Sequence, residues 1–258
     1  MATRASMSAS ATTLAELLVE LVESNPTLPL YRYLVDGEAE CVTLTSGELH
    51  QAALSIAEQL RERCKPGDRV LLLAAPGLDF IRGFFGIQYA GLVATSSYPP
   101  HPRRVDRTLN RFQAIVSSCE PKVALVTSTM VDFAKQLGLS AIDLNTVPIN
   151  TRSTEFPVSV KPTAAAILQY TSGSTREPRG VMLTHRNVLN NLAFIKERFG
   201  HSRESVGVIW LPLPRHGANR RYPPATLRQL SCGIAQSNAG TSTAHALAEC
   251  NYSLPRYD

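Results

Sequence analysis

The segment from Tyr170 to Met182 holds the residues whose types and order could do chemistry. It reads Tyr-Thr-Ser-Gly-Ser-Thr-Arg-Glu-Pro-Arg-Gly-Val-Met and follows an apolar stretch, residues 164–169, that predicts a buried strand. Backbone N–H groups and hydroxyls in such a turn can surround phosphate oxygens while a cation neutralises their charge. A polar surface turn is the alternative interpretation. Although the spacing is not that of the Walker loop, the length of the segment and its cations favour a polyphosphate-binding loop.

The loop needs a framework, and the preceding sequence alternates between helical and strand-like segments. Hydrophobic periodicity predicts helices over residues 14–22, 46–60, 78–90 and 106–118 and after residue 128. Strands are expected over residues 28–35, 41–44, 70–75, 92–96, 123–127 and 164–169. The uninterrupted apolar run at 70–75 is typical of a strand covered on both faces. Short connections between alternating strands and helices therefore predict an α/β fold with a mostly parallel sheet and flanking helices.

Two features of this framework bear on where a ligand could bind. Four aromatic residues recur at helical spacing and are interpreted as core rather than as a cofactor site: Phe80, Phe84, Phe85 and Tyr89. Residues 146–162 contain three prolines and predict a long exposed connection.

The composition is that of a soluble globular protein. The 258 residues are 44% hydrophobic and 18% charged, which suffices for one large domain or two small ones. No apolar run reaches the roughly 18 residues that a bilayer crossing needs, so no transmembrane segment is expected. Residues 1–13 lack the apolar region of a secretory signal and are expected to be disordered. These features predict a cytoplasmic protein.

Charge and cysteine content exclude two further classes of function. The net charge is +5, but residues 213–258 hold 5 Lys and Arg against 2 Asp and Glu, so most of the basicity belongs to a short tail. No nucleic-acid partner is therefore expected. The cysteines are odd in number, show no Cys-x-x-Cys spacing and predict no metal site; they are interpreted as buried or unreactive thiols: Cys41, Cys64, Cys119, Cys232 and Cys250.

The loop sequence resembles the phosphate loop of the adenylate-forming superfamily, whose usual pattern is [YF]-T-S-G-S-T-G-x-P-K-G. The upstream motifs look most like those of the fatty acyl-AMP ligases within that superfamily. They are Gly-Asp-Arg-Val-Leu-Leu-Leu from residue 67, Pro-Gly-Leu-Asp-Phe from residue 76, Tyr-Ala-Gly from residue 89 and Tyr-Pro-Pro from residue 98. The resemblance covers residues 14–212 and implies the N-terminal part of the AMP-binding fold.

By this resemblance, a fatty carboxylate attacks the α-phosphate of Mg-ATP, which gives acyl-AMP and pyrophosphate. The acyl group then passes to a thiol, commonly that of an acyl carrier protein. The implied cofactors are ATP and Mg²⁺, and the implied substrate is a long-chain fatty acid. The residues implied to bind the ATP phosphates are Thr171, Ser172, Gly173, Ser174, Thr175, Arg179 and Gly180.

Two loop positions depart from the family pattern. Arg176 replaces a glycine, and if that glycine has a positive φ the replacement costs on the order of 1 kcal/mol and stiffens the loop. Arg179 replaces the lysine, so the charge is kept but its donors are differently placed. His185 and Asn187 begin a predicted helix after the loop, and His185 is interpreted as a capping or supporting residue rather than a general base.

The sequence after Pro212 reads as if its codons were in the wrong frame. Trp210-Leu211-Pro212 matches the start of the next family motif, W-L-P-x-Y-H-D-M-G, but the following residues do not continue it. When the last two bases of each codon are joined to the first base of the next, allowed codons for residues 213–227 spell Y-H-D-M-G-L-I-G-G-I-L-Q-P-L-Y. This agreement predicts a frameshift near Pro212 or Leu213.

The expected organisation is a disordered N-terminus over residues 1–13, a partial AMP-binding domain over 14–212 and a non-native tail over 213–258. The expected function is ATP-dependent adenylation of a fatty acid, impaired by the loss of downstream motifs. The alternative is a catalytically inactive fragment that binds at most a phosphate or a partner.

Overall fold

Two-sided burial of the central strands organises the protein around a six-stranded sheet. The structure is a computed structural model that describes residues 11–34, 41–75, 77–97, 105–149, 157–171, 178–202 and 205–207. In strand β3 (Arg69–Leu73), Val70 and Leu72 join one hydrophobic cluster, whereas Leu71 and Leu73 join another. All four side chains are 0% exposed. This confirms that the uninterrupted apolar run is a strand covered on both faces.

The six strands lie in the order β6-β5-β3-β4-β7-β8, and five of them are parallel. The pair β7–β8 is antiparallel. The strands that accompany β3 are β4 (Val93–Ser96), β5 (Val123–Val126), β6 (Ala141–Asp143), β7 (Ala165–Thr171) and β8 (Arg179–Thr184). Strands β1 (Pro29–Leu34) and β2 (Cys41–Thr45) form a separate antiparallel pair. The α/β fold with a mostly parallel sheet is therefore confirmed.

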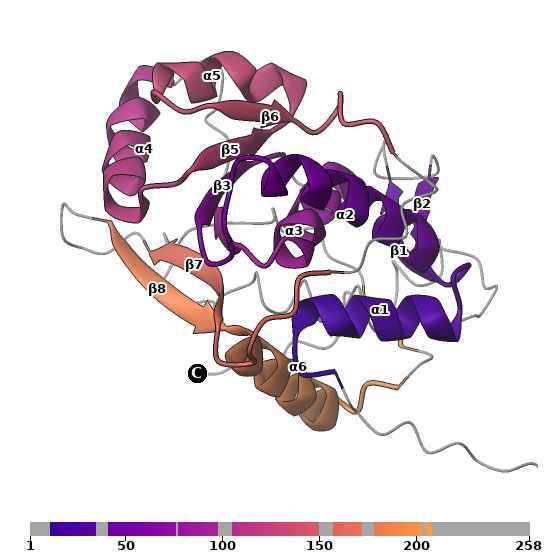
Figure 1. Cartoon of the computed structure of the whole chain (residues 1–258). Coiled ribbons are helices and arrows are strands. Elements are labelled where there is room, and N and C mark those ends of the chain that lie inside the picture. Colours follow the sequence, from indigo (N-terminus) through magenta and orange to yellow (C-terminus); the bar gives the residue numbers. More distant parts are fainter. Residues whose placement is uncertain are drawn as a thin grey trace, which may run out of the picture.

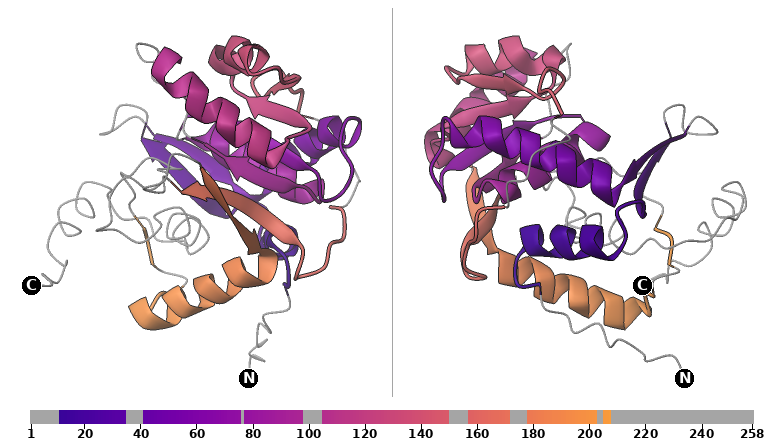
Figure 2. Two further views of the ribbon diagram at one scale, coloured as in Figure 1. Left: turned by 90° about the vertical axis from the view of Figure 1, so that its left-hand side faces the viewer. Right: turned by 45° about the vertical axis from the view of Figure 1, so that its right-hand side comes forward.

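Helices cover both faces of the sheet (Figures 1 and 2). One face carries α1 (Leu14–Ser24), α2 (Ser46–Arg61) and α3 (Leu78–Tyr89), and the other carries α4 (Val105–Cys119), the short 3-10 helix η2 (Ser128–Met130) and α5 (Val131–Gln136). The last helix, α6 (His185–Phe199), follows β8 directly. The four aromatic residues of α3 are at most 3% exposed, which confirms their interpretation as core.

Three helices begin with the same local hydrogen-bonding motif. Threonine at the N-cap accepts a hydrogen bond from the third helical N–H, and the side chain at that third position accepts one from the threonine N–H. The threonines are Thr13 before α1, Thr45 before α2 and Thr184 before α6. Hydrogen bonds from the backbone and side chain of Thr45 also hold the pKa of Glu48 below its usual value. These caps set where each helix starts.

The structure differs from the sequence-based expectation at two strands and one connection. Strands β6 and β8 were not expected, because β6 has three residues and four of the six residues of β8 lie in the segment interpreted as loop, which ends at Met182. The connection over residues 146–162 was expected to be exposed, but Val158 and Val160 are partly buried. The N–H of Val158 donates to the carbonyl of Tyr89 at 2.8 Å, so this part of the connection packs beside the end of α3.

The sheet changes from buried to exposed at β8. Within the described sheet β8 is an edge strand, and its first four residues are exposed. Val181 and Met182 are 46% and 67% exposed, and on α6 Phe194 and Phe199 are 58% and 63% exposed. Among the described residues, no helix is both long and apolar enough to span a membrane.

A testable consequence of the close packing between α2 and α3 concerns Gly86. A Cβ atom at Gly86 would lie 2.6 Å from Ile56 Cβ, so the two helices must move apart to accept alanine. We expect Gly86→Ala to lower the free energy of unfolding by about 1–3 kcal/mol, despite the better helix propensity of alanine. Urea denaturation measures this change. Gln113→Ala, at an exposed position of α4, is the control and should change it by less than about 0.5 kcal/mol.

Candidate functional site

The predicted phosphate loop connects strands β7 and β8, which pair as an antiparallel hairpin. Tyr170 pairs with Gly180 and Thr171 pairs with Arg179, so the two ends of the loop lie side by side. Thr171 is described by its backbone only. The predicted phosphate ligands Ser172, Gly173, Ser174 and Thr175 lie outside the described residues. The structure therefore places the base of the loop and two of its predicted ligands, Arg179 and Gly180.

The base of the loop lies at the carboxyl ends of the parallel strands. Strand β7 runs parallel to β4, with Thr95 beside Leu168, and β4 runs parallel to β3. Chain that leaves β7 at Thr171 therefore emerges on the same side of the sheet as Ser96 and Ser97, which follow along β4. Ligands of open α/β sheets bind outside these carboxyl ends. This position suits a polyphosphate-binding loop.

Arg179 and Gly180 occupy strand positions rather than loop positions. Both are exposed. A Cβ at Gly180 would lie 3.2 Å from Cζ of Tyr170 and 3.0 Å from Cδ1 of Leu168, so the missing side chain lets the Tyr170 ring lie under β8. Arg179 pairs with Thr171 at the base of the loop. The phosphate-binding role of both residues stays a prediction.

His185 lies at the opposite end of β8 from the loop. It is the first residue of α6, and the preceding Thr184 is the N-cap. Five residues of strand, about 17 Å, separate Arg179 from Thr184, so the imidazole lies far from the base of the loop. His185 is 2% exposed, and its Nδ1 accepts a hydrogen bond of 3.2 Å from the N–H of Leu14. His185 therefore joins the start of α6 to the start of α1.

A second polar cluster lies at the carboxyl end of β6, at the other edge of the sheet from β8. Ser128 Oγ donates to Asp143 Oδ2 at 2.7 Å, and Asn145 Nδ2 donates to Asp79 Oδ2 at 3.1 Å. Asp79 also pairs with Arg82 at 3.0 Å. Asp79, Arg82 and Asn145 line a cavity of about 210 Å³ together with Leu144, Val147 and Ile149. The cluster joins α3 to the end of β6 and lies away from the loop.

Within the part of the chain that the structure describes, no group of three or more His, Cys, Asp or Glu residues could hold a metal ion. Cys64 and Cys119 are buried free thiols and Cys41 is an exposed one. Cys232 and Cys250 lie outside the described residues.

The buried position of His185 predicts a specific dependence of stability on pH. Burial lowers the pKa of His185 from 6.5 to about 4, although the charge of Glu16 acts in the opposite direction. Between these values the unfolded chain binds a proton that the folded chain does not, so the free energy of unfolding falls as the pH drops from 6.5 towards 4. The loss attributable to His185 is about 3 kcal/mol at most.

His185→Asn keeps a hydrogen-bond acceptor near the Leu14 N–H but does not titrate. We expect the variant to lose less stability than the unmodified chain between pH 7 and pH 4.5, as measured by urea denaturation at each pH. Carboxylates such as Glu16 and Glu48 titrate in both proteins. Equal losses of stability in the two proteins would therefore mean that such shared groups cause the loss and that His185 does not.

Comparison with known proteins places the chain in a family. The family described as AMP-binding enzyme matches residues 22–218. A medium-chain fatty-acid–[acyl-carrier-protein] ligase, JamA of Moorena producens, is 36% identical over 196 residues, which are 70% of this chain and 32% of that protein. A 4-hydroxyphenylalkanoate adenylyltransferase of Mycobacterium tuberculosis is 31% identical over 220 residues, which are 79% of this chain and 35% of that protein. The chain thus spans about a third of the length of these relatives.

The fold agrees with that of a solved relative. The fatty acyl-adenylate ligase of Legionella pneumophila, solved in complex with acyl adenylate and pyrophosphate, is similar with a TM-score of 0.77 and 33% identity. The similarity covers 88% of this chain and 39% of that one. With a family match over most of its length and a sheet that agrees with that of a solved ligase, the chain belongs to the AMP-binding enzyme family.

Proposed function

We propose that this chain carries the ATP-phosphate-binding part of an enzyme that activates a fatty acid by adenylation. The observation that supports this most is the position of the Thr-Ser-Gly-Ser-Thr segment. It continues from β7, the last of the parallel strands, at their carboxyl ends, and it returns into an antiparallel strand that carries Arg179. A loop held in this way can enclose a polyphosphate with hydroxyls, N–H groups and a cation.

In the proposed reaction, a carboxylate oxygen of the fatty acid forms a bond to the α-phosphorus of ATP. The bond from that phosphorus to the bridging oxygen breaks, and pyrophosphate leaves with its electron pair. The carboxylate is already ionised at neutral pH, so the step needs no general base. This agrees with the position of His185 at the end of β8 opposite the base of the loop. The contribution of the protein is to position the phosphates and to neutralise the charge that develops on the leaving group.

Among the predicted ligands, Thr171, Ser172, Gly173, Ser174, Thr175 and Gly180 would hold the phosphates through hydroxyls and backbone N–H groups. Arg179 would add a positive charge at the base of the loop. Mg²⁺ would enter with the nucleotide and supply further charge neutralisation.

The relatives support the proposed substrates and partners. The Legionella ligase was solved with acyl adenylate and pyrophosphate, and JamA is described as a ligase of medium-chain fatty acids and acyl carrier protein. We therefore propose a fatty acid as the acyl substrate, and an acyl carrier protein or another thiol as the acceptor. We also propose that the protein works in the cytoplasm and binds no nucleic acid.

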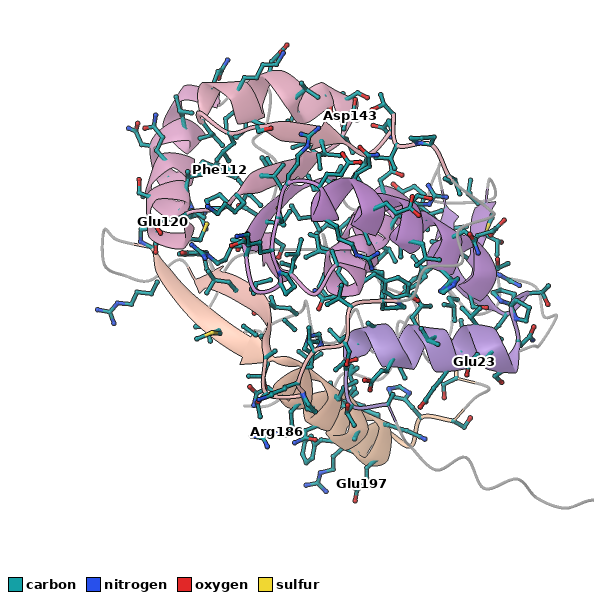
Figure 3. All side chains as sticks on the ribbon, in the orientation of Figure 1. Glu23, Phe112, Glu120, Asp143, Arg186 and Glu197 are labelled. Carbon is teal, nitrogen blue, oxygen red and sulfur yellow. The ribbon has the colours of Figure 1, made fainter. Side chains whose placement is uncertain are left out.

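The charge of Arg179 can be tested by its effect on nucleotide binding. We expect Arg179→Ala to weaken Mg-ATP binding about tenfold, because a charge-assisted hydrogen bond to a phosphate is lost. Isothermal titration calorimetry measures the dissociation constant. Arg186→Ala is the matched control, since Arg186 is also exposed but lies beyond the far end of β8, at the start of α6 (Figure 3). Equal binding by the unmodified chain and the Arg179 variant would remove Arg179 from the site.

The proposed reaction itself is tested by ATP–pyrophosphate exchange in the presence of Mg²⁺ and fatty acids of different lengths. Exchange that requires the fatty acid supports adenylation by this chain. Mg-ATP binding without exchange supports the second candidate, an inactive fragment that retains phosphate binding.

The second candidate is favoured by the alternative codon reading of residues 213–227, which continues the family motif after Pro212 in another frame. Sequencing the DNA across the codons for residues 206–233 and beyond tests it. If the other frame encodes Y-H-D-M-G and stays open, residues 213–258 are a frameshifted tail. If it does not, residues 213–258 are part of the normal protein.

A further inference from the structure

Tyr170 is the last residue of β7 whose side chain the structure describes, and it contacts elements on both sides. The side chain is 1% exposed and belongs to a small buried cluster with Ile115 and Cys119 of α4. Its hydroxyl donates a hydrogen bond of 2.8 Å to Ser118 Oγ, which lies 52 residues earlier in the chain. Its ring lies under Gly180, where a Cβ atom would come within 3.2 Å of Cζ. One side chain thus connects β7, β8 and the end of α4.

The end of α4 that receives Tyr170 is itself held in place. Arg69 of β3 donates from Nε to the carbonyl of Cys119 at 2.7 Å and from Nη2 to the carbonyl of Glu120 at 3.1 Å. Glu120 has a φ of 43°, a left-handed conformation that ends the helix there. Figure 3 labels Glu120 at this end of α4, close to the start of β8. Arg69 therefore fixes the end of α4 from which Ser118 contacts Tyr170.

The chemistry of the Tyr170–Ser118 contact suits a permanent anchor. Burial raises the pKa of Tyr170 above its usual value, so its hydroxyl stays a neutral donor at physiological pH. Ser118 itself is exposed, so its replacement by alanine removes the partner without opening a cavity in the core. The contact can therefore be broken from either side with little change in packing.

We propose that Tyr170 is a positioning residue for phosphate binding: by its hydroxyl on Ser118 and its ring beneath Gly180, it holds the base of the β7–β8 hairpin against α4. Thr171, the first predicted phosphate ligand, follows Tyr170 directly, and Arg179 and Gly180 pair across the same two positions. A shift of the Tyr170 ring would move both ends of the loop together. The proposal rests on the proposed function of the loop.

The anchor is tested first by amide hydrogen exchange on the full chain. Tyr170→Phe keeps the ring and removes the hydroxyl, and Ser118→Ala removes the same hydrogen bond from the other side. We expect the amides of β8 to exchange about threefold to tenfold faster in both variants, and those of β3 and α2 to be unchanged. Tyr33→Phe, at a tyrosine of β1 that is 41% exposed, is the matched control and should not alter β8.

The positioning role is tested by Mg-ATP binding to the same variants. We expect Tyr170→Phe and Ser118→Ala each to raise the dissociation constant about threefold to tenfold. The double variant should bind Mg-ATP no more weakly than Tyr170→Phe alone, because removing the Tyr170 hydroxyl already removes the hydrogen bond that Ser118→Ala removes. Ser118→Thr keeps a hydroxyl and should bind as the unmodified chain does. A purely structural role would lower the melting temperature and leave the dissociation constant unchanged.

The outcomes separate this inference from the proposed function. If the unmodified chain binds Mg-ATP and Tyr170→Phe binds it equally well, the positioning role is wrong and the proposed function stands. Additive losses in the double variant also overturn the role, since the two residues would then act separately. If the unmodified chain binds no Mg-ATP, the proposed function fails and the positioning role fails with it, whatever the exchange data show about the anchor.

Discussion

Burial of both faces of the parallel strands is the constraint on which the rest of the structure depends. Val70 and Leu72 face α2 and α3, whereas Leu71 and Leu73 face α4 and α5, so neither helical layer can be removed without exposing the sheet. Strands covered in this way leave only their ends accessible to a ligand. The position of the candidate site at the carboxyl ends follows from this burial as much as from the residues of the loop.

The loop is placed at the point where this two-sided burial ends. Strand β7 still contributes buried residues such as Ala166 and Tyr170, whereas its antiparallel neighbour β8 is mostly exposed. In this hairpin β7 is held by its packing in the sheet, whereas β8 makes fewer buried contacts. Contacts that hold β7 therefore decide where the base of the loop lies, and the hydroxyl of Tyr170 provides one of them through its hydrogen bond to Ser118 of α4.

The sequence predicted the features that depend on local pattern and missed those that depend on distant partners. Four of the five parallel strands (β3, β4, β5 and β7), the helices on both faces and the aromatic core of α3 followed from periodicity, whereas the three-residue strand β6 did not. The family followed from the loop residues and the motifs upstream of them. Strand β8 was missed because its glycine and arginine resemble loop residues; it is a strand because it pairs with β7. The hydrogen bonds between Leu14 and His185 and between Tyr170 and Ser118 join residues that are 171 and 52 positions apart. A local sequence pattern cannot predict such contacts. The sequence signal for Tyr170 was its place directly before the loop motif, but that place did not identify Ser118 as its partner.

The two ends of β8 are fixed by contacts of different chemistry, which gives them different sensitivities to acid. At the loop end, Tyr170 and Ser118 share a hydrogen bond between neutral hydroxyls, and neither group changes charge when the pH falls. At the helix end, the imidazole of His185 must stay neutral to accept the Leu14 N–H, and burial lowers its pKa to about 4. Strong acid therefore charges the group that joins α6 to α1 while leaving the Tyr170 contact intact. The base of the candidate phosphate loop is held by the contact that does not titrate in acid.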